Sequence, residues 1–184
     1  MNNSTNIKIF FLLIMFSLIL TSELVSKDKS YIEISVEGDY SKKYKFVNEI
    51  SVGQIMMQSE ISSNSTLGFF TDRNPKFPFL FSCVLANLKD FEINKNTYQT
   101  IAVVDEIPVY NKNIPVCCFL TLTINDKTAK KREYFSTGEE GNFVEITNTN
   151  DEFIFGTISS ILILKTDSTK KLKVSGKFKI NKSK

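Results

Sequence analysis

The side chains of this sequence that can do chemistry are cysteines, carboxylates and lysines, because the chain contains no histidine. Without an imidazole, a serine-protease triad, a histidine general base and a histidine-ligated zinc or haem are excluded. The three cysteines are Cys83, Cys117 and Cys118. If residues 116–124 form a strand, the adjacent Cys117 and Cys118 point to opposite faces, which is unfavourable for a shared metal ion. We therefore predict no metal site and no cofactor.

Two interpretations of the cysteines stay open. In an oxidising compartment, Cys83 can form a disulfide with Cys117 or Cys118, whichever lies on its own side of the strand. Alternatively, all three residues are small buried hydrophobic side chains without a bond. A nucleophilic or redox role is disfavoured, because no histidine is present to generate a thiolate.

Acidic residues occur as three adjacent pairs, at Asp105-Glu106, Glu139-Glu140 and Asp151-Glu152. A glycosidase needs two carboxyl groups across a cleft with different pKa values, and neighbours in the sequence do not supply that arrangement. Each pair lies beside a turn signal or a strand end, where acids are normally solvated. The pattern therefore predicts no catalytic residues, and a hydrolase that uses carboxylates alone remains only an alternative.

Lysines are concentrated at the C-terminal end, where residues 165–184 contain eight lysines and one acidic residue. Lys173, Lys177 and Lys179 lie on one face of the strand expected there, and they are our candidate binding residues for an anionic surface, such as a phosphate-bearing lipid or an acidic polysaccharide. The alternative is a solvated face that prevents pairing between sheet edges. The net charge of the whole chain is only +3, so no nucleic-acid partner is expected.

The N-terminus has the pattern of a secretory signal. Lys8 precedes a nearly continuous apolar segment at residues 9–20. As a helix this segment spans roughly 18 Å, which is shorter than the ~30 Å hydrocarbon core of a membrane. We therefore predict a signal peptide at residues 1–26, with cleavage after Ser22 or Ser26, and an exported protein that is periplasmic or secreted. An uncleaved membrane anchor is the alternative.

Residues 27–184 are expected to form a single domain of β-strands. Apolar residues alternate with polar ones at residues 32–36, 116–124 and 172–180, as in strands with one buried face. Residues 153–164 are apolar on both faces, and Gly156 within them predicts a bulge or a close backbone approach. One short helix is expected within residues 82–90. The fold class is therefore all-β, a single antiparallel β-sandwich or calycin-like barrel with at most one short helix.

Four C-terminal segments carry a family resemblance: Tyr134–Gly138 (YFSTG), Gly141–Thr147 (GNFVEIT), Phe155–Ile158 (FGTI) and Val174–Ile180 (VSGKFKI). They resemble the C-terminal half of a poorly characterised family of small exported proteins and lipoproteins of Bacteroidota, with calycin-like or sandwich β folds. Ile158 replaces a Phe of the family pattern, and the lipoprotein cysteine is missing. The resemblance covers about 50 of 184 residues and implies an exported all-β domain. It implies no catalytic residues.

These observations favour an exported, non-enzymatic binding or structural module. An alternative is a lipocalin-like carrier of a small apolar molecule, because the chain contains 16 Phe and 6 Tyr that can line a cavity inside a small barrel. The carrier requires that these rings line the interior without filling it.

Overall fold

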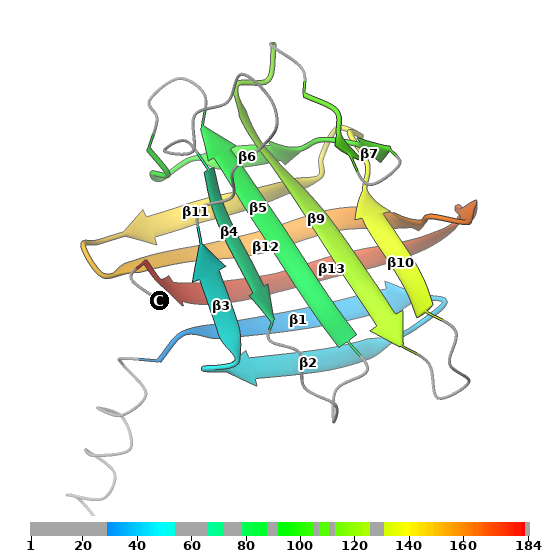
Figure 1. Ribbon diagram of the computed structural model, residues 1–184, viewed down its shortest axis with the longest axis horizontal. Coiled ribbons are helices and arrows are strands. Elements are labelled where there is room, and N and C mark those ends of the chain that lie inside the picture. The colour runs from blue at the N-terminus through cyan, green and yellow to red at the C-terminus, as the bar shows by residue number, and fades with distance from the viewer. Residues whose placement is uncertain are drawn as a thin grey trace, which may run out of the picture.

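The computed structural model describes residues 29–53, 66–71, 79–87, 92–104, 107–110, 113–125 and 131–182, and these residues form strands and no helix (Figure 1). The all-β prediction is confirmed. Accordingly, the described part of the chain contains no helix able to cross a membrane. The predicted signal peptide at residues 1–26 lies outside the described residues.

The strands are β1 (Tyr31–Gly38), β2 (Lys42–Val47), β3 (Ile50–Gly53), β4 (Thr66–Thr71), β5 (Phe79–Asn87), β6 (Thr97–Thr100), β7 (Val103–Val104), β8 (Ile107–Pro108), β9 (Val116–Asn125), β10 (Lys131–Ser136), β11 (Phe143–Thr149), β12 (Phe153–Leu164) and β13 (Asp167–Asn181).

Eleven of these strands belong to one sheet, which folds over into two layers (Figure 1). The sheet order is β2-β1-β13-β12-β11-β6-β9-β5-β4-β3, and β10 pairs with both β9 and β12. One layer contains β1, β2, β11, β12 and β13, and the other contains β3, β4, β5, β9 and β10, with strands that cross the first layer steeply. The chain passes between the layers after β2, where Asn48 has a φ of 59°. This arrangement is a barrel-like sandwich.

The pairing is antiparallel with one exception. β6 runs parallel to β9, with Gln99 opposite Cys117 and Thr100 opposite Cys118. The predicted antiparallel fold is thus confirmed for the other pairs of described strands, and this pair is the exception. The parallel pair is possible because the chain between β6 and β9 is long enough to return to the start of the neighbouring strand, and it forms the β7–β8 hairpin on the way.

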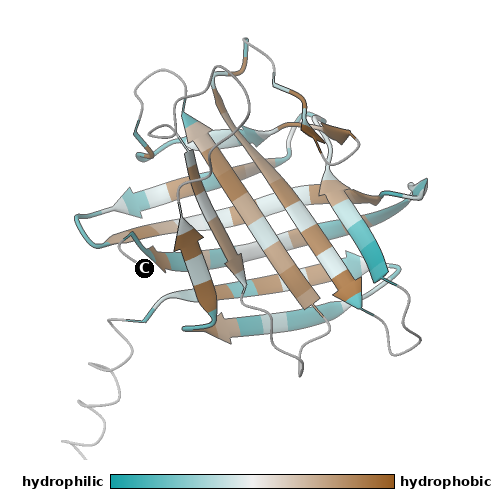
Figure 2. Ribbon diagram, in the orientation of Figure 1, coloured by the Kyte–Doolittle hydropathy of each residue, from teal (hydrophilic) through white to brown (hydrophobic). Residues whose placement is uncertain are grey.

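The short helix expected within residues 82–90 is a second correction. Residues 82–87 belong to strand β5, and residues 88–90 lie outside the described part of the chain. The five residues from Cys83 to Asn87 are all buried, so both faces of the strand are covered and the alternation that marks a half-exposed strand is lost. In Figure 2, β5 is apolar along most of its length.

The core lies between the two layers and is rich in aromatic rings. The predicted alternation is confirmed in β1 and in β13 up to Phe178, where Ile34 and Val174 are buried between neighbours that are partly or fully exposed. Phe69 and Phe178 meet across the layers with ring centroids 4.9 Å apart. Burial of these inner faces leaves the polar residues of β1, β2 and β13 on the outside of the molecule.

Gly156 of β12 lies at a close backbone approach, one of the two features predicted for it, and the bulge beside it has its extra residue, Thr147, in β11. The register between β11 and β12 shifts between Ile146 and Asn148, beside the position that pairs with Gly156. A Cβ atom at Gly156 would collide with the carbonyl oxygen of Glu145 and with the ring of Phe178. The glycine therefore allows both the bulge and the packing of Phe178 against the backbone.

Candidate ligand-binding surface

The outer face of β1, β2 and β13 brings together polar side chains from distant parts of the sequence. β1 is the central strand, because it pairs with β2 on one side and β13 on the other. The register places Glu33 opposite both Lys45 and Lys177, and it places Ser35 opposite both Lys43 and Ser175. We call these six residues the lysine–serine face.

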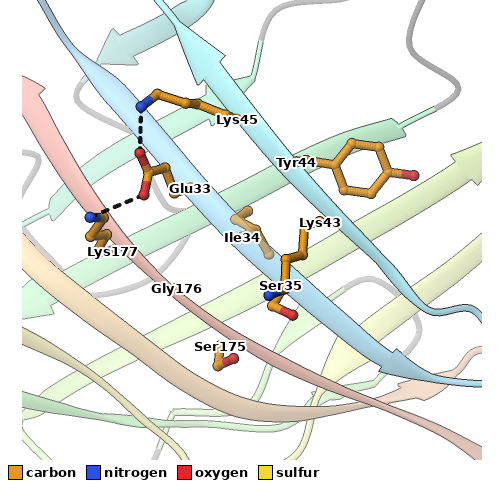
Figure 3. Close-up of a pocket in the computed structure, with 9 residues that line it drawn as sticks. All are labelled: Glu33, Ile34, Ser35, Lys43, Tyr44, Lys45, Ser175, Gly176 and Lys177. Atoms are coloured by element: carbon orange, nitrogen blue, oxygen red, sulfur yellow. Dashed lines mark ion pairs between the residues drawn. The ribbon is translucent and has the colours of Figure 1, made fainter.

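Glu33 is the centre of an ion-pair network on this face (Figure 3). The Nζ atom of Lys45 lies 2.6 Å from Oε1 of Glu33, and the Nζ atom of Lys177 lies 3.1 Å from Oε2. Hydrogen bonds donated by Lys45 and Lys177 lower the pKa of the Glu33 carboxyl group, and the same contact raises the pKa of Lys177. Glu33 is therefore a carboxylate at neutral pH, with each oxygen bound by a different lysine.

The lysine–serine face lines an open depression of about 530 Å³, together with Ile34, Tyr44 and Gly176. Three lysines and one glutamate give this surface a net charge of +2. The hydroxyl groups of Ser35 and Ser175 add hydrogen-bond donors and acceptors. The arrangement is suited to bind a ligand that carries both negative charge and hydroxyl groups.

The structure separates the three lysines predicted as binding residues. Lys177 belongs to the lysine–serine face. Lys173 is exposed but lies outside the depression, opposite Glu37 of β1 and Ile161 of β12. The environment of Lys179 differs most from the expectation.

Lys179 is buried, with 7% of its surface exposed. Its Nζ atom lies 3.9 Å from the centre of the Phe153 ring and 5.8 Å from the centre of the Phe155 ring. The expectation that Lys179 is exposed on the same face as Lys173 and Lys177 was therefore wrong, although the residue lies on that face of the strand. The reason is the neighbouring strand β12, whose aromatic rings cover the lysine in a cation–π contact.

Sequence reasoning missed most of this surface. Lys43 and Lys45 alternate with the buried Tyr44 and Phe46, which is a signal that they share the outer face of a strand. The sequence contains no signal for the pairing of β1 with β13, because these strands come from opposite ends of the described chain. Glu33 was consequently not identified as a partner of either lysine.

Of the two interpretations of the cysteines, the structure agrees with the second, because all three are free and buried and none forms a disulfide. Cys83 and Cys118 lie in the main core, whereas Cys117 packs in a second cluster with Ala86 and Ile101, which confirms that Cys117 and Cys118 point to opposite faces. Burial raises the pKa of all three thiols, that of Cys117 to about 11. These properties fit small buried side chains.

The acidic pairs are solvated where the structure describes them. Glu139, Glu140, Asp151 and Glu152 are exposed, and Glu139 forms an ion pair with Lys171 at 3.5 Å. Asp105-Glu106 lies outside the described residues. Among the residues with assigned positions, no group of three metal-ligating side chains is present.

Comparison with protein-family models, with characterised proteins and with solved structures finds no match to this chain. The resemblance of the C-terminal segments to exported Bacteroidota proteins therefore stays a prediction. The structure itself defines the class of protein. It is an all-β protein whose large sheet folds over into two layers and whose outer face has a depression lined by lysines and serines.

Proposed function

We propose that this protein is an exported, non-enzymatic binding module that holds an anionic ligand on the lysine–serine face. The observation that carries the proposal is the depression itself, which three lysines line, two of them bound to the Glu33 carboxylate and the third, Lys43, opposite Ser35. Export is inferred from the signal-peptide pattern at residues 1–26. An anionic ligand is consistent with export, because an exported protein encounters the charged polymers and surfaces outside the cytoplasm.

An acidic polysaccharide fits this surface better than a lipid bilayer does. Ser35 and Ser175 can exchange hydrogen bonds with sugar hydroxyl groups. Strands β2 and β13 are separated by β1 and therefore lie about 10 Å apart, and Lys43 and Lys45 lie about 7 Å apart on β2, so several charged groups of a polymer can bind together.

The geometry does not favour a hydrolase. Glycoside hydrolysis needs a protonated acid and a second carboxyl group across the cleft, and the depression contains only Glu33. The two lysines lower the pKa of Glu33, so this residue is a poor proton donor at neutral pH.

The interior does not favour a lipocalin-like carrier. The ring of Phe79 stacks on Tyr44, with centroids 4.1 Å apart, and lies 5.7 Å from Phe46. Phe69 and Phe178 fill the space between the layers further along. Aromatic rings thus occupy the part of the interior that a carrier would keep open for its ligand.

The test is salt-dependent binding to polygalacturonate, a polysaccharide that carries one carboxylate per sugar, with neutral dextran as the control polymer. Binding should weaken as the screening length falls from about 10 Å at 0.1 M salt to about 3 Å at 1 M. A variant with Lys43→Gln, Lys45→Gln and Lys177→Gln should bind at least about tenfold more weakly.

The matched control replaces Lys95, Lys165 and Lys182 by Gln, since these lysines are exposed and lie outside the depression. It removes the same amount of charge and should keep nearly all the binding. Equal losses in the two triple variants would show that binding follows total charge, and the assignment of the face would be wrong. Binding to phosphatidylserine vesicles without binding to polygalacturonate would instead favour a membrane partner.

A further inference from the structure

The contact between Glu33 and its two lysines has the geometry of an occupied oxyanion site. Lys45 binds one carboxylate oxygen at 2.6 Å and Lys177 binds the other at 3.1 Å, from opposite neighbours of β1. Figure 3 shows Glu33 between the two ammonium groups. Any group with two oxygen atoms on one centre, such as a carboxylate or a sulfate, presents the same pair of acceptors.

We propose that Glu33 is an internal competitor, whose carboxylate occupies the place between Lys45 and Lys177 that an acidic group of the ligand takes on binding. This inference rests on the proposed function of the lysine–serine face. It assigns Lys45 and Lys177 as the pair that recognises the acidic group. Lys43, Ser35 and Ser175 then hold the adjoining part of the polymer.

The exposure of the three side chains makes this exchange feasible. Lys45 and Lys177 expose 62% and 60% of their side chains, and Glu33 exposes 30% of its own. Ion pairs at such positions are screened by water and contribute little to the stability of a fold. Lysine side chains are also long and flexible, so they can follow an incoming anion while the strands stay in place.

Competition with Glu33 also predicts a preference for polymers. A single small anion must displace a carboxylate that is permanently held next to the lysines at a high effective concentration. A polymer gains additional contacts to Lys43 and the serines, which offset this cost. Galacturonic acid monomer should therefore bind far more weakly than polygalacturonate at equal sugar concentration.

The decisive experiment compares Glu33→Gln with Glu37→Gln in binding to polygalacturonate. Glu37 lies on the same face of β1, opposite Lys173 and outside the depression, so its replacement changes the net charge by the same amount. We expect Glu33→Gln to raise the affinity by about tenfold, the factor that corresponds to releasing two exposed ion pairs. Glu37→Gln should change the affinity by less than about twofold. The gain from Glu33→Gln should vanish when Lys45 and Lys177 are also replaced by Gln.

The outcomes distinguish this inference from the proposed function. If the lysine variants weaken binding but Glu33→Gln and Glu37→Gln behave alike, the face binds the polymer and Glu33 is not a competitor. If Glu33→Gln weakens binding, Glu33 positions the lysines for the ligand, which also overturns the inference. If neither the wild-type protein nor Glu33→Gln binds the polymer, both the proposed function and this inference are wrong. Urea midpoints show whether Glu33→Gln and Glu37→Gln fold. If Glu33→Gln does not fold, Glu33→Thr replaces it, because threonine is favourable in a strand.

Discussion

Replacing Phe178 by alanine should destabilise the protein far more than replacing the adjacent Lys177. Phe178 is 1% exposed, and its ring packs against Phe69 of the other layer and against the backbone at Gly156. Loss of a buried phenylalanine side chain costs about 3–5 kcal/mol. Lys177→Ala removes an exposed contact with Glu33 that water screens, so it should change stability very little.

Urea denaturation followed by far-ultraviolet circular dichroism measures both losses, and tyrosine fluorescence serves as a second probe because the chain contains no tryptophan. A domain of ordinary stability unfolds with about 5–15 kcal/mol, so Phe178→Ala should remain folded in water with a much lower midpoint. A double-mutant cycle with Phe69→Ala isolates the contact between the rings. We expect a coupling energy of about 0.5–1.5 kcal/mol.

Two results would refute this reasoning. Similar midpoints for Phe178→Ala and Lys177→Ala would mean that the buried and solvated faces of β13 are wrongly assigned, and with them the lysine–serine face. Additive losses in the cycle would mean that Phe69 and Phe178 do not contact each other across the layers. Glu33→Ala serves as a control, because it should cost about as little as Lys177→Ala.

Four further predictions concern other parts of the molecule. Gly156→Ala should destabilise by about 1–3 kcal/mol or more because of its collision with the Glu145 carbonyl, whereas Gly53→Ala, with open space around its Cβ, should leave the urea midpoint nearly unchanged. Lys179→Gln should lower stability by about 0.5–2 kcal/mol through loss of the cation–π contact, with unchanged polygalacturonate binding; a loss of binding would return this lysine to the ligand site. The three buried cysteines should react with Ellman's reagent only after unfolding, and fewer than three thiols per chain in urea would indicate a disulfide. Since the folded thiols hold their protons more tightly than unfolded ones, stability should fall as the pH rises from about 9 toward 11, and a flat stability curve over that range would contradict their burial.

Much of the fold could be predicted because the signals that define it are local. In strand β13, apolar residues alternate with lysines, and in β1 they alternate with glutamate and serine. The buried face of each strand is therefore visible in the sequence. Strand β5 gave no such signal, because Cys83 to Asn87 are buried on both faces. A run of this kind is equally compatible with a buried helix, which explains the error.

The candidate site could be predicted only in part because it depends on strand pairing. Lys177 was identified from β13 alone. Its partner Glu33 lies near the opposite end of the described chain, and only the register of β1 with β13 brings the two together. Periodicity shows which face of a strand is exposed, but it contains no information about which strand lies beside it.

The three lysines of β13 show why charge density alone does not define a site. They share one face of one strand, yet Lys177 contacts an exposed carboxylate and Lys179 is covered by aromatic rings. A ligand can replace the Glu33 carboxylate, because the exchange leaves an ammonium group bound to an anion in water. It cannot reach Lys179 without removing that side chain from Phe153 and Phe155. Under the proposed function, anion recognition therefore belongs to the two lysines bound to Glu33, because their partner is exchangeable.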